Sequence, residues 1–342
     1  MKKSQPFEAA RFAELLCEWQ KLKGRKNLPW FTDDPYRRWL SEIMLQQTQV
    51  SVVKDYFARF LEAFPTVEDL ACADEEDVMR LWAGLGYYSR ARNLHRAAKL
   101  VVQAGGFPIS REEWEMLPGV GTSTAAALAS FCSSEPAAVC DGNVKRVLAR
   151  ILALNEPVDQ AKTGKYLQQE ADRLVSRIEP GVYNQAMMDL GAMLCTKHAP
   201  KCPECPVTEY CRAYAAGNPE DYPRKLPKKP KRTALVHALL AVEGKGADRR
   251  VWLVKRTLLQ KGMGHWKGLW TLPEVPESSE RELARIEHVM SHVALTLVVH
   301  AAKPEQMPPD AFTVPAVDIA EAPLPAPVRK LLSTLLFEPQ LF

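Results

Sequence analysis

The most restrictive feature of this chain is a group of four cysteines within 17 residues. Cys195, Cys202, Cys205 and Cys211 follow the spacing C-x6-C-x2-C-x5-C. Four thiolates in so short a span suit either a tetrahedral metal ion or a four-iron cluster. Structural zinc usually uses two CxxC pairs, whereas a single CxxC stands here between two isolated cysteines. The spacing therefore favours a 4Fe-4S cluster over zinc, and it implies a reducing compartment.

The rest of the chain divides into a helical part and a strand-rich part. From residue 7 to about 214, apolar residues recur at helical spacing. The segment 223–232 then combines six basic residues with three prolines and no acid, which predicts an extended linker. Whether this linker is only a tether or also contacts phosphates stays open. Beyond it, β-branched runs predict strands at Leu235–Val242, Val251–Lys255 and Val293–Val299.

Composition supports two folded domains. The chain has 342 residues, of which 25% are charged and 46% hydrophobic, so it can build a sizeable core. The net charge of +4 does not by itself indicate a polyanionic partner. No apolar run approaches the 18 residues of a membrane span, and no apolar run follows the lysines at the start, so we expect neither membrane insertion nor a secretory signal.

A short glycine-rich turn is the second informative feature. The segment Leu117–Gly121, with Gly119 and Gly121, reads as a tight hairpin between two helices. Glycines allow close backbone approach, and the N–H groups at the next helix start can hold a phosphate. Alone, such a segment is also compatible with an ordinary turn. About twenty residues later, Asp141 opens another helix.

The hairpin, the aspartate and the cysteine loop follow one another in an order that resembles the helix-hairpin-helix base-excision DNA glycosylases with an iron–sulfur cluster. Three further segments, 41–50, 84–94 and 141–147, resemble the adenine DNA glycosylases of the MutY family. The resemblance implies a mainly α helix-hairpin-helix glycosylase core and a C-terminal α+β Nudix-like domain. The expected boundaries are 1–214 for the glycosylase domain with its cluster loop, 215–233 for the basic linker, and 234–342 for the Nudix-like domain.

Cleavage of an adenine N-glycosidic bond needs a proton for the leaving base and an anion for the cationic sugar. Glu42 has the apolar neighbours Trp39, Ile43 and Leu45, which would raise its pKa. By resemblance, Glu42 is the acid that protonates adenine. Asp141, beside Asn143 near a helix N-terminus, is the anion that stabilises the sugar cation or adds to it.

The resemblance also assigns binding residues. Glycosylases of the endonuclease III type carry a lysine nucleophile two residues after the last glycine of the hairpin. Here that position is Ser123, which provides no amine for Schiff-base chemistry. The extruded base is expected to meet Trp30 and Gln185. Gln47 and Tyr87 are expected to fill the gap in the duplex, and Thr48 and Leu85 to contact the opposite base.

The C-terminal part resembles Nudix domains through residues 260–273. The metal-binding box of Nudix hydrolases reads R-E-x-x-E-E, but Arg281-Glu282 is followed here by Leu-Ala-Arg-Ile. We therefore expect the fold without nucleotide hydrolysis. In the resembled family this domain recognises 8-oxoguanine through a Phe-Ser-His loop. Ser291 and His292 match that loop, whereas Met290 replaces its aromatic residue.

The sequence thus predicts a monofunctional glycosylase, a hydrolase that removes adenine mispaired with 8-oxoguanine or guanine from double-stranded DNA. We expect a monomer in the bacterial cytoplasm, associated with the nucleoid and with no membrane partner. Two alternatives stay open. One is a bifunctional glycosylase/AP lyase of the endonuclease III type, and the other is a non-catalytic iron–sulfur DNA-binding protein.

Overall fold

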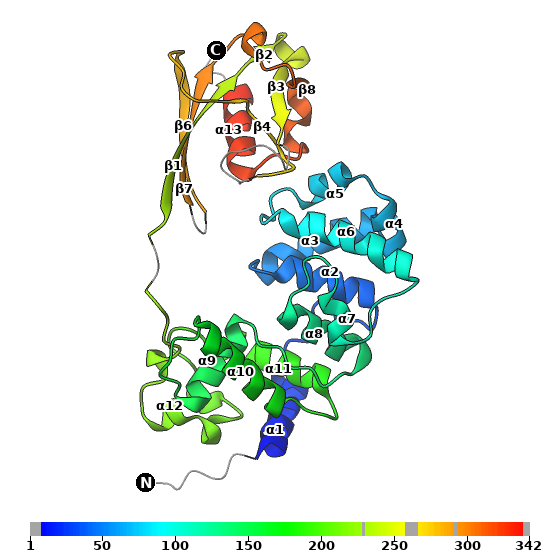
Figure 1. Ribbon diagram of the computed structural model, residues 1–342, viewed down its shortest axis with the longest axis vertical. Helices are drawn as coiled ribbons and strands as arrows, with labels where there is room; N and C mark the ends of the chain where they lie inside the picture. Colours follow the sequence, from blue (N-terminus) through cyan, green and yellow to red (C-terminus); the bar gives the residue numbers. More distant parts are fainter. Residues whose placement is uncertain (1–7, 228–229, 257–265, 291–292, 338–342) are drawn as a thin grey trace. The chain divides into compact units, whose positions relative to one another are not determined.

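The computed structural model describes residues 8–227, 230–256, 266–290 and 293–337 (Figure 1). Its contacts divide the chain into two compact units. Unit 1 contains residues 1–57, 66–71 and 96–228, and unit 2 contains residues 58–65, 72–95 and 229–342. The predicted division at residues 214 and 233 concerns folding domains and stays a prediction.

Up to the linker, the described chain is helical, as predicted. No described helix has the length and apolarity that crossing a bilayer requires. The α-helices are α1 (Ala9–Lys23), α2 (Pro35–Leu45), α3 (Val50–Ala63), α4 (Val67–Cys72), α5 (Glu75–Trp82), α6 (Ser89–Ala104), α7 (Arg111–Glu115), α8 (Thr122–Ser133), α9 (Gly142–Leu152), α10 (Ala161–Leu174), α11 (Pro180–Met193) and α12 (Arg212–Ala215). Short 3-10 turns are η1 (Cys202–Glu204), η2 (Thr208–Tyr210) and η3 (Pro219–Asp221).

Local sequence signals explain where the helices begin. The Asp34 side chain caps α2 by accepting the Tyr36 N–H at 2.9 Å, and Pro35 takes the first helical position, as predicted. A capping box between Ser110 and Glu113 starts α7. These caps fix the starts of α2, which lines the site described below, and of α7, which packs against α8.

The core of unit 1 combines aromatic side chains with a helix of small residues. Trp39 and Trp114 are fully buried, and both rings contact Phe107 with centroid separations of 6.2 and 6.0 Å. Residues 125–129 of α8 are all buried alanine or leucine. Small side chains let α8 approach α2, α7 and α11 together, and this packing brings residues from distant parts of the sequence to one place.

Strands begin at Arg232, within unit 2. They are β1 (Arg232–Leu240), β2 (Val242–Glu243), β3 (Arg250–Lys255), β4 (Trp270–Thr271), β5 (Glu274–Val275), β6 (Glu282–Val289), β7 (Val293–Ala301) and β8 (Phe312–Pro315). The 3-10 turns η4 (Gly246–Asp248), η5 (Pro304–Gln306) and η6 (Ala316–Ala320) and helix α13 (Ala326–Phe337) complete the described part. The three strands expected from the sequence are present as β1, β3 and β7, with slightly longer bounds.

The strands form two four-stranded sheets. One has the order β5-β1-β7-β6, in which β1 and β7 are parallel with His237 opposite Val298. In the other, β3 pairs with β2, β4 and β8. Leu332 and Leu335 of α13 belong to the same apolar core as Val251 and Leu297 of the strands. The C-terminal part is therefore α+β, as predicted.

The stretch that aligns with the Nudix box is an extended strand. Glu282–Val289 forms β6 and pairs with β7 in antiparallel register, with Ile286 opposite Leu297. Successive side chains of a strand point to opposite faces. This stretch therefore does not present a row of carboxylates on one helical face, in addition to lacking the paired acids.

Candidate active site

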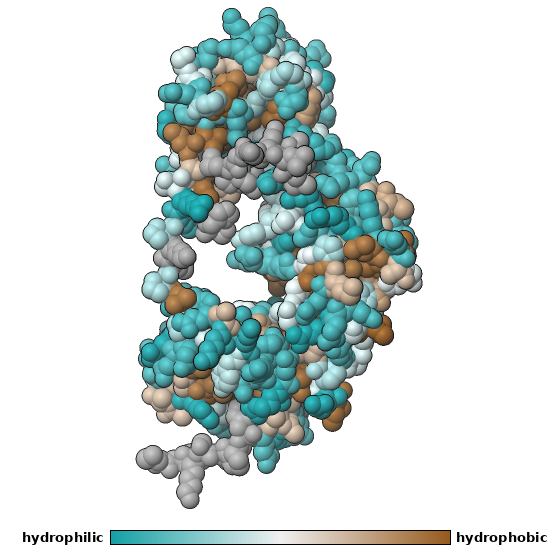
Figure 2. Space-filling model, in the orientation of Figure 1, coloured by the Kyte–Doolittle hydropathy of each residue, from teal (hydrophilic) through white to brown (hydrophobic). Residues whose placement is uncertain are grey.

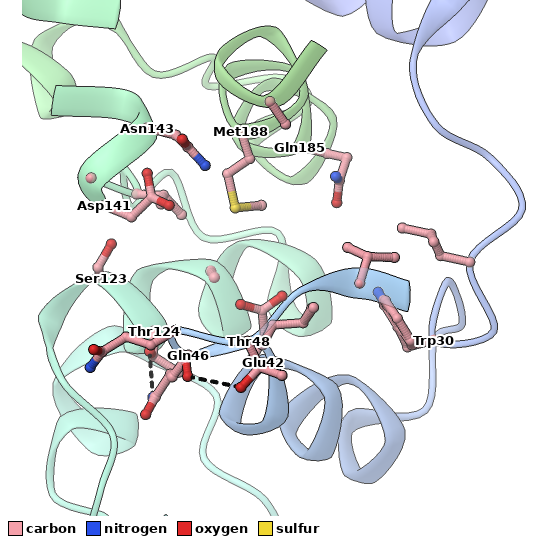
Figure 3. Close-up of a pocket in the computed structure, with 18 of the residues that line it drawn as sticks. Trp30, Glu42, Gln46, Thr48, Ser123, Thr124, Asp141, Asn143, Gln185 and Met188 are labelled. Carbon is pink, nitrogen blue, oxygen red and sulfur yellow. Dashed lines mark hydrogen bonds between the residues drawn. The ribbon is translucent and has the colours of Figure 1, made fainter. Parts of the chain in front are cut away.

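Unit 1 contains a cavity of about 750 Å³ at which helices α2, α8, α9 and α11 meet (Figure 3). Its walls also include the segment before α2 and the turn between α2 and α3. The cavity brings together most of the predicted site residues of this unit. They are Trp30, Glu42, Gln47, Thr48, Ser123, Asp141, Asn143 and Gln185.

Glu42 projects into this cavity from α2 (Figure 3). Burial raises the pKa of Glu42 to about 7, and the nearby carboxylate of Asp141 adds to the increase, while Arg38 opposes it. The predicted elevation of this pKa thus has the expected cause, removal of the charged form from water. A carboxyl group with this pKa still carries a proton near neutrality and can donate it.

Asp141 faces the same cavity from the N-terminus of α9. It is the N-cap of that helix, and its Oδ1 accepts the Val144 N–H at 2.8 Å. Burial raises the pKa of Asp141 above its usual value, whereas the backbone N–H groups of Val144 and Asn143 lower it. The helix terminus therefore holds the carboxylate in place and supports its negative charge.

Asn143 is oriented by its neighbours on α9 and α11. Its Oδ1 accepts a hydrogen bond from Arg146 Nη2 at 2.9 Å, so the amide nitrogen is directed to the cavity (Figure 3). The same Arg146 nitrogen donates to the Gly191 carbonyl at 2.6 Å. A Cβ atom at Gly191 would lie 2.7 Å from the Cβ of Asn143, so this approach of the two helices requires glycine.

Ser123 lines the same cavity as Asp141, although the two residues are distant in the sequence. Its Oγ accepts the backbone N–H of Cys140 at 3.1 Å, immediately before Asp141. A hydroxyl thus occupies the position where a bifunctional enzyme would need an amine. Its bond to Cys140 helps to hold the segment that leads into α9.

The predicted hairpin joins α7 to α8. Gly119 has φ of +83° and Gly121 is the N-cap of α8, while Leu117 and Val120 are buried beneath the turn. Both glycines are exposed, as a backbone phosphate site requires. The Gln46 amide donates to Thr124 Oγ1 at 3.2 Å, which ties the end of α2 to the start of α8 (Figure 3).

Two of the residues expected to enter the duplex have a left-handed backbone. Gln47 has φ of +60° and Tyr87 has φ of +49°, a conformation that costs energy for residues other than glycine. Gln47 is exposed between α2 and α3, in unit 1. Tyr87 is 45% exposed in the turn that precedes α6, in unit 2. Backbone strain of this kind is typical of functional loops.

The side chain of Arg90 stabilises the backbone of the turn around Tyr87. This side chain is buried, and its Nη2 donates to the carbonyls of Leu85 and Gly86 at 3.1 and 3.0 Å. Its guanidinium also lies 5.3 Å from the Trp82 ring centroid. The buried guanidinium of Arg90 therefore stabilises the backbone of this turn. Leu85 is 5% exposed, so its contact with the opposite base stays a prediction.

A buried carboxylate that the sequence reasoning missed organises the wall formed by α11. Asp189 is fully buried and accepts hydrogen bonds from Gln185 Nε2 at 2.8 Å and Gln20 Nε2 at 3.1 Å. Arg25, also missed, donates to it from Nε at 2.9 Å and from Nη2 at 2.6 Å. The available signal was the spacing of Gln185 and Asp189, four residues apart on one helix face. Trp30 forms another part of the wall and contacts Phe57 edge-to-face at 5.5 Å.

The four clustered cysteines line one small cavity beside α9 and α11, together with apolar side chains such as Val147 and Leu190. All four are partly buried and free of disulfides. The buried Arg150 donates to Cys195 Sγ at 3.3 Å and to the Thr196 carbonyl at 2.7 Å. Within the described ranges, no three His, Cys, Asp or Glu side chains surround a position for a single metal ion. The donor set itself, four thiols with apolar walls, is the one that an iron–sulfur cluster uses.

Two predicted site residues, Ser291 and His292, lie outside the described residues. Met290, which replaces the aromatic residue of the resembled loop, is described, and its carbonyl accepts a hydrogen bond from Lys231 Nζ at 2.9 Å. On the face seen in Figure 2, the region of α9, α10 and α12 carries mainly hydrophilic residues.

Sequence comparisons give a consistent result. The family described as "HhH-GPD superfamily base excision DNA repair protein" matches residues 40–177. An adenine DNA glycosylase of Buchnera aphidicola is 36% identical over 77% of this chain and 73% of its own length. The human adenine DNA glycosylase is 32% identical over 90% of this chain and 69% of its own length.

Solved structures show the same helical fold. A thermostable thymine-DNA glycosylase superimposes with a TM-score of 0.55 and 27% identity, covering 61% of this chain and 97% of that chain. Endonuclease III in a non-covalent DNA complex gives a TM-score of 0.52 at 22% identity, with coverage of 62% and 99%. These matches cover the helix-hairpin-helix region and not the whole chain.

Proposed function

Because the chain belongs to the adenine DNA glycosylase family, we propose that it hydrolyses the N-glycosidic bond of adenine mispaired with 8-oxoguanine or guanine in double-stranded DNA. The observation that carries this proposal is a pair of carboxyl groups in one cavity, of which Glu42 has a pKa of about 7. The two groups come from different helices and have different surroundings, which separates an acid from an anion.

In the proposed reaction, Glu42 donates its proton to a ring nitrogen of adenine and makes the base a better leaving group. As the bond to the sugar breaks, positive charge develops on the deoxyribose, and the carboxylate of Asp141 stabilises it. The Asn143 amide lies beside that carboxylate and offers donor hydrogens to the sugar or to the attacking water. A water molecule then completes the hydrolysis.

The adenine must leave the base stack to enter the cavity. We propose that Trp30 and Gln185 hold the extruded base, that Gln47 and Tyr87 fill the space it leaves, and that Thr48 and Leu85 contact the opposite base. The hairpin at Gly119 and Gly121 is proposed to hold a backbone phosphate through the N–H groups at the start of α8.

The proposed enzyme is monofunctional because Ser123 offers no amine. Incubation with a duplex containing adenine opposite 8-oxoguanine should release adenine and leave the strand intact until alkali is added. Strand breakage without alkali would favour the bifunctional alternative. Normal mispair binding with no base release would favour the non-catalytic alternative.

We also propose that Cys195, Cys202, Cys205 and Cys211 hold a 4Fe-4S cluster. The cluster would cross-link the loop that follows α11, and the Arg150 guanidinium would donate to one of its thiolates. The test is chemical: purified protein should contain about four irons per chain, and Cys202→Ser should reduce the iron content. About one zinc per chain would support the alternative metal.

The C-terminal part is proposed to be a Nudix-like domain that reads 8-oxoguanine through Ser291 and His292. Replacement of Ser291 by alanine should reduce the preference for adenine opposite 8-oxoguanine over adenine opposite guanine. An unchanged preference would contradict this assignment. We propose that the protein is a monomer. It would act at the bacterial nucleoid, because chromosomal DNA is the proposed substrate.

The most direct test is a single-turnover assay on a duplex with adenine opposite 8-oxoguanine, comparing the wild type with Glu42→Gln. The wild type should release adenine and the variant should be severely slowed. Equal rates would overturn the proposed role of Glu42.

A further inference from the structure

We propose that Asp189 is a positioning residue, which fixes the side-chain amide of Gln185 with its oxygen toward the cavity and thereby makes the site select purines with a 6-amino group. This inference rests on the proposed function. Asp189 would thus influence which base is released without touching that base.

The amide of Gln185 has one donor end and one acceptor end, and a neighbour decides which end faces the base. Asp189 receives the donor end, because Gln185 Nε2 donates to Asp189 Oδ1 at 2.8 Å. Figure 3 shows the Gln185 side chain reaching from α11 into the cavity, with its oxygen at the tip.

The other hydrogen-bond partners of Asp189 show that Gln185 is the donor and Asp189 the acceptor in this contact. Arg25 donates to Asp189 from its backbone N–H at 2.8 Å and from two guanidinium nitrogens. An arginine side chain offers only donors, so Asp189 faces it as an acceptor. Gln20 supplies another N–H at 3.1 Å. A carboxylate held in this way accepts hydrogen bonds only, so the NH₂ group of Gln185 must face it.

Gln20 is itself held in place by a glycine. A Cβ atom at Gly24 would lie 2.2 Å from the side-chain carbonyl carbon and oxygen of Gln20. The absence of a side chain at position 24 therefore makes room for the Gln20 amide. The network around Asp189 is thus built by the fold and surrounded by protein.

A fixed carbonyl oxygen discriminates between purines. The 6-amino group of adenine donates a hydrogen bond, and the Gln185 oxygen can accept it. Hypoxanthine has an oxygen at the same position and offers only lone pairs there. Two acceptors that face each other cannot hydrogen-bond to one another, so this arrangement is unfavourable.

The experiment compares single-turnover release of adenine and of hypoxanthine from the same position opposite 8-oxoguanine, and reads the ratio of the two rates. Asp189→Ala frees the amide to rotate, so the ratio should fall by about tenfold or more. Asp189→Asn keeps one oxygen that accepts from the Arg25 guanidinium and from Gln185, so it should keep the ratio. Its NH₂ group faces the donors of the Arg25 backbone and Gln20, so this variant should be less stable than the wild type. A loss of folding would slow both substrates and leave the ratio unaffected.

Two further variants make the outcome decisive. Gln185→Met leaves Asp189 in place but removes the acceptor, so it should lower the ratio even where Asp189→Ala fails to fold. Glu179→Gln, which removes a carboxylate bound to Lys21 at the start of α11, should leave the ratio unchanged. Unchanged ratios in both Asp189→Ala and Gln185→Met would overturn the proposal, as would a wild type that releases both bases equally. A wild type that releases neither base would instead overturn the proposed function.

Discussion

At the scale of single residues, the first prediction concerns Glu42, the proposed proton donor. Replacing its acid by an amide of the same shape removes the proton donor and retains the cavity wall. General acid catalysis typically contributes about 10²–10⁴-fold, so Glu42→Gln should lower the single-turnover rate by that factor. Binding of the mispaired duplex should change little, and Glu179→Gln is the matched control. A variant with near-wild-type rate would contradict the assignment.

The ionisation of Glu42 also predicts a pH profile. In the proposed reaction Glu42 must be protonated, and burial raises the pKa of Glu42 to about 7. The single-turnover rate should therefore fall as the pH rises through about 7, and the residual activity of Glu42→Gln should lack this decline. A wild-type rate that stays constant to pH 9 would argue against a proton donated by Glu42.

The residues found from sequence share one property: each lies in a motif whose chemistry is local. Glu42 and Asp141 were singled out because their segments resemble the MutY family, and the structure places both residues in one cavity. For Asp189, the spacing from Gln185 indicates only a shared helix face, and its contact with Arg25 becomes visible only in the folded structure. Arg90 illustrates the same limit, since only the structure shows that it lies beneath the Tyr87 turn.

At the scale of elements, the close approach of α9 and α11 determines where Asp141 and Asn143 lie. A methyl group at Gly191 would collide with Asn143 at 2.7 Å. Gly191→Ala should reduce the free energy of unfolding by about 1–3 kcal/mol and should also slow base release. Gly106→Ala, where an added Cβ meets no atom within 4 Å, is the control for denaturant unfolding. Equal stability of both variants would contradict the packing argument.

Elements with strong periodicity or clear caps were predictable, such as α2 after Asp34 and the strand β7. The left-handed backbones of Gln47 and Tyr87 were not, because neither residue type favours that conformation and only the surrounding structure imposes it. In β6, the absence of the Nudix metal-binding box coincides with a strand in place of a helix. Without the paired acids, Glu282–Val289 alternates exposed and partly buried side chains and pairs with β7.

At the scale of the whole molecule, the proposed contacts with phosphates predict salt-dependent binding. The net charge is only +4, so the attraction must come from local groups such as the hairpin and the linker. The logarithm of the association constant for undamaged duplex should fall linearly with the logarithm of salt concentration, by roughly 0.9 per phosphate contact. An affinity that does not vary with salt would exclude this footprint.

The division of the chain into two compact units could not be predicted from the sequence. Composition predicts a boundary near the basic linker, but residues 58–65 and 72–95 group with unit 2 although they belong to the helical stretch. Such grouping depends on contacts between segments far apart in the chain, and no local pattern encodes it.

The raised pKa of Glu42 also has a thermodynamic consequence for folding. Because the folded protein binds this proton more tightly than the unfolded chain does, proton uptake accompanies folding between about pH 4.5 and 7. The contribution of Glu42 to the free energy of unfolding is therefore largest in acid and decreases as the pH rises. The carboxyl group that we propose as the proton donor thus makes the native state less stable at the pH where Glu42 loses its proton, and the Glu42→Gln variant should resist denaturant better there.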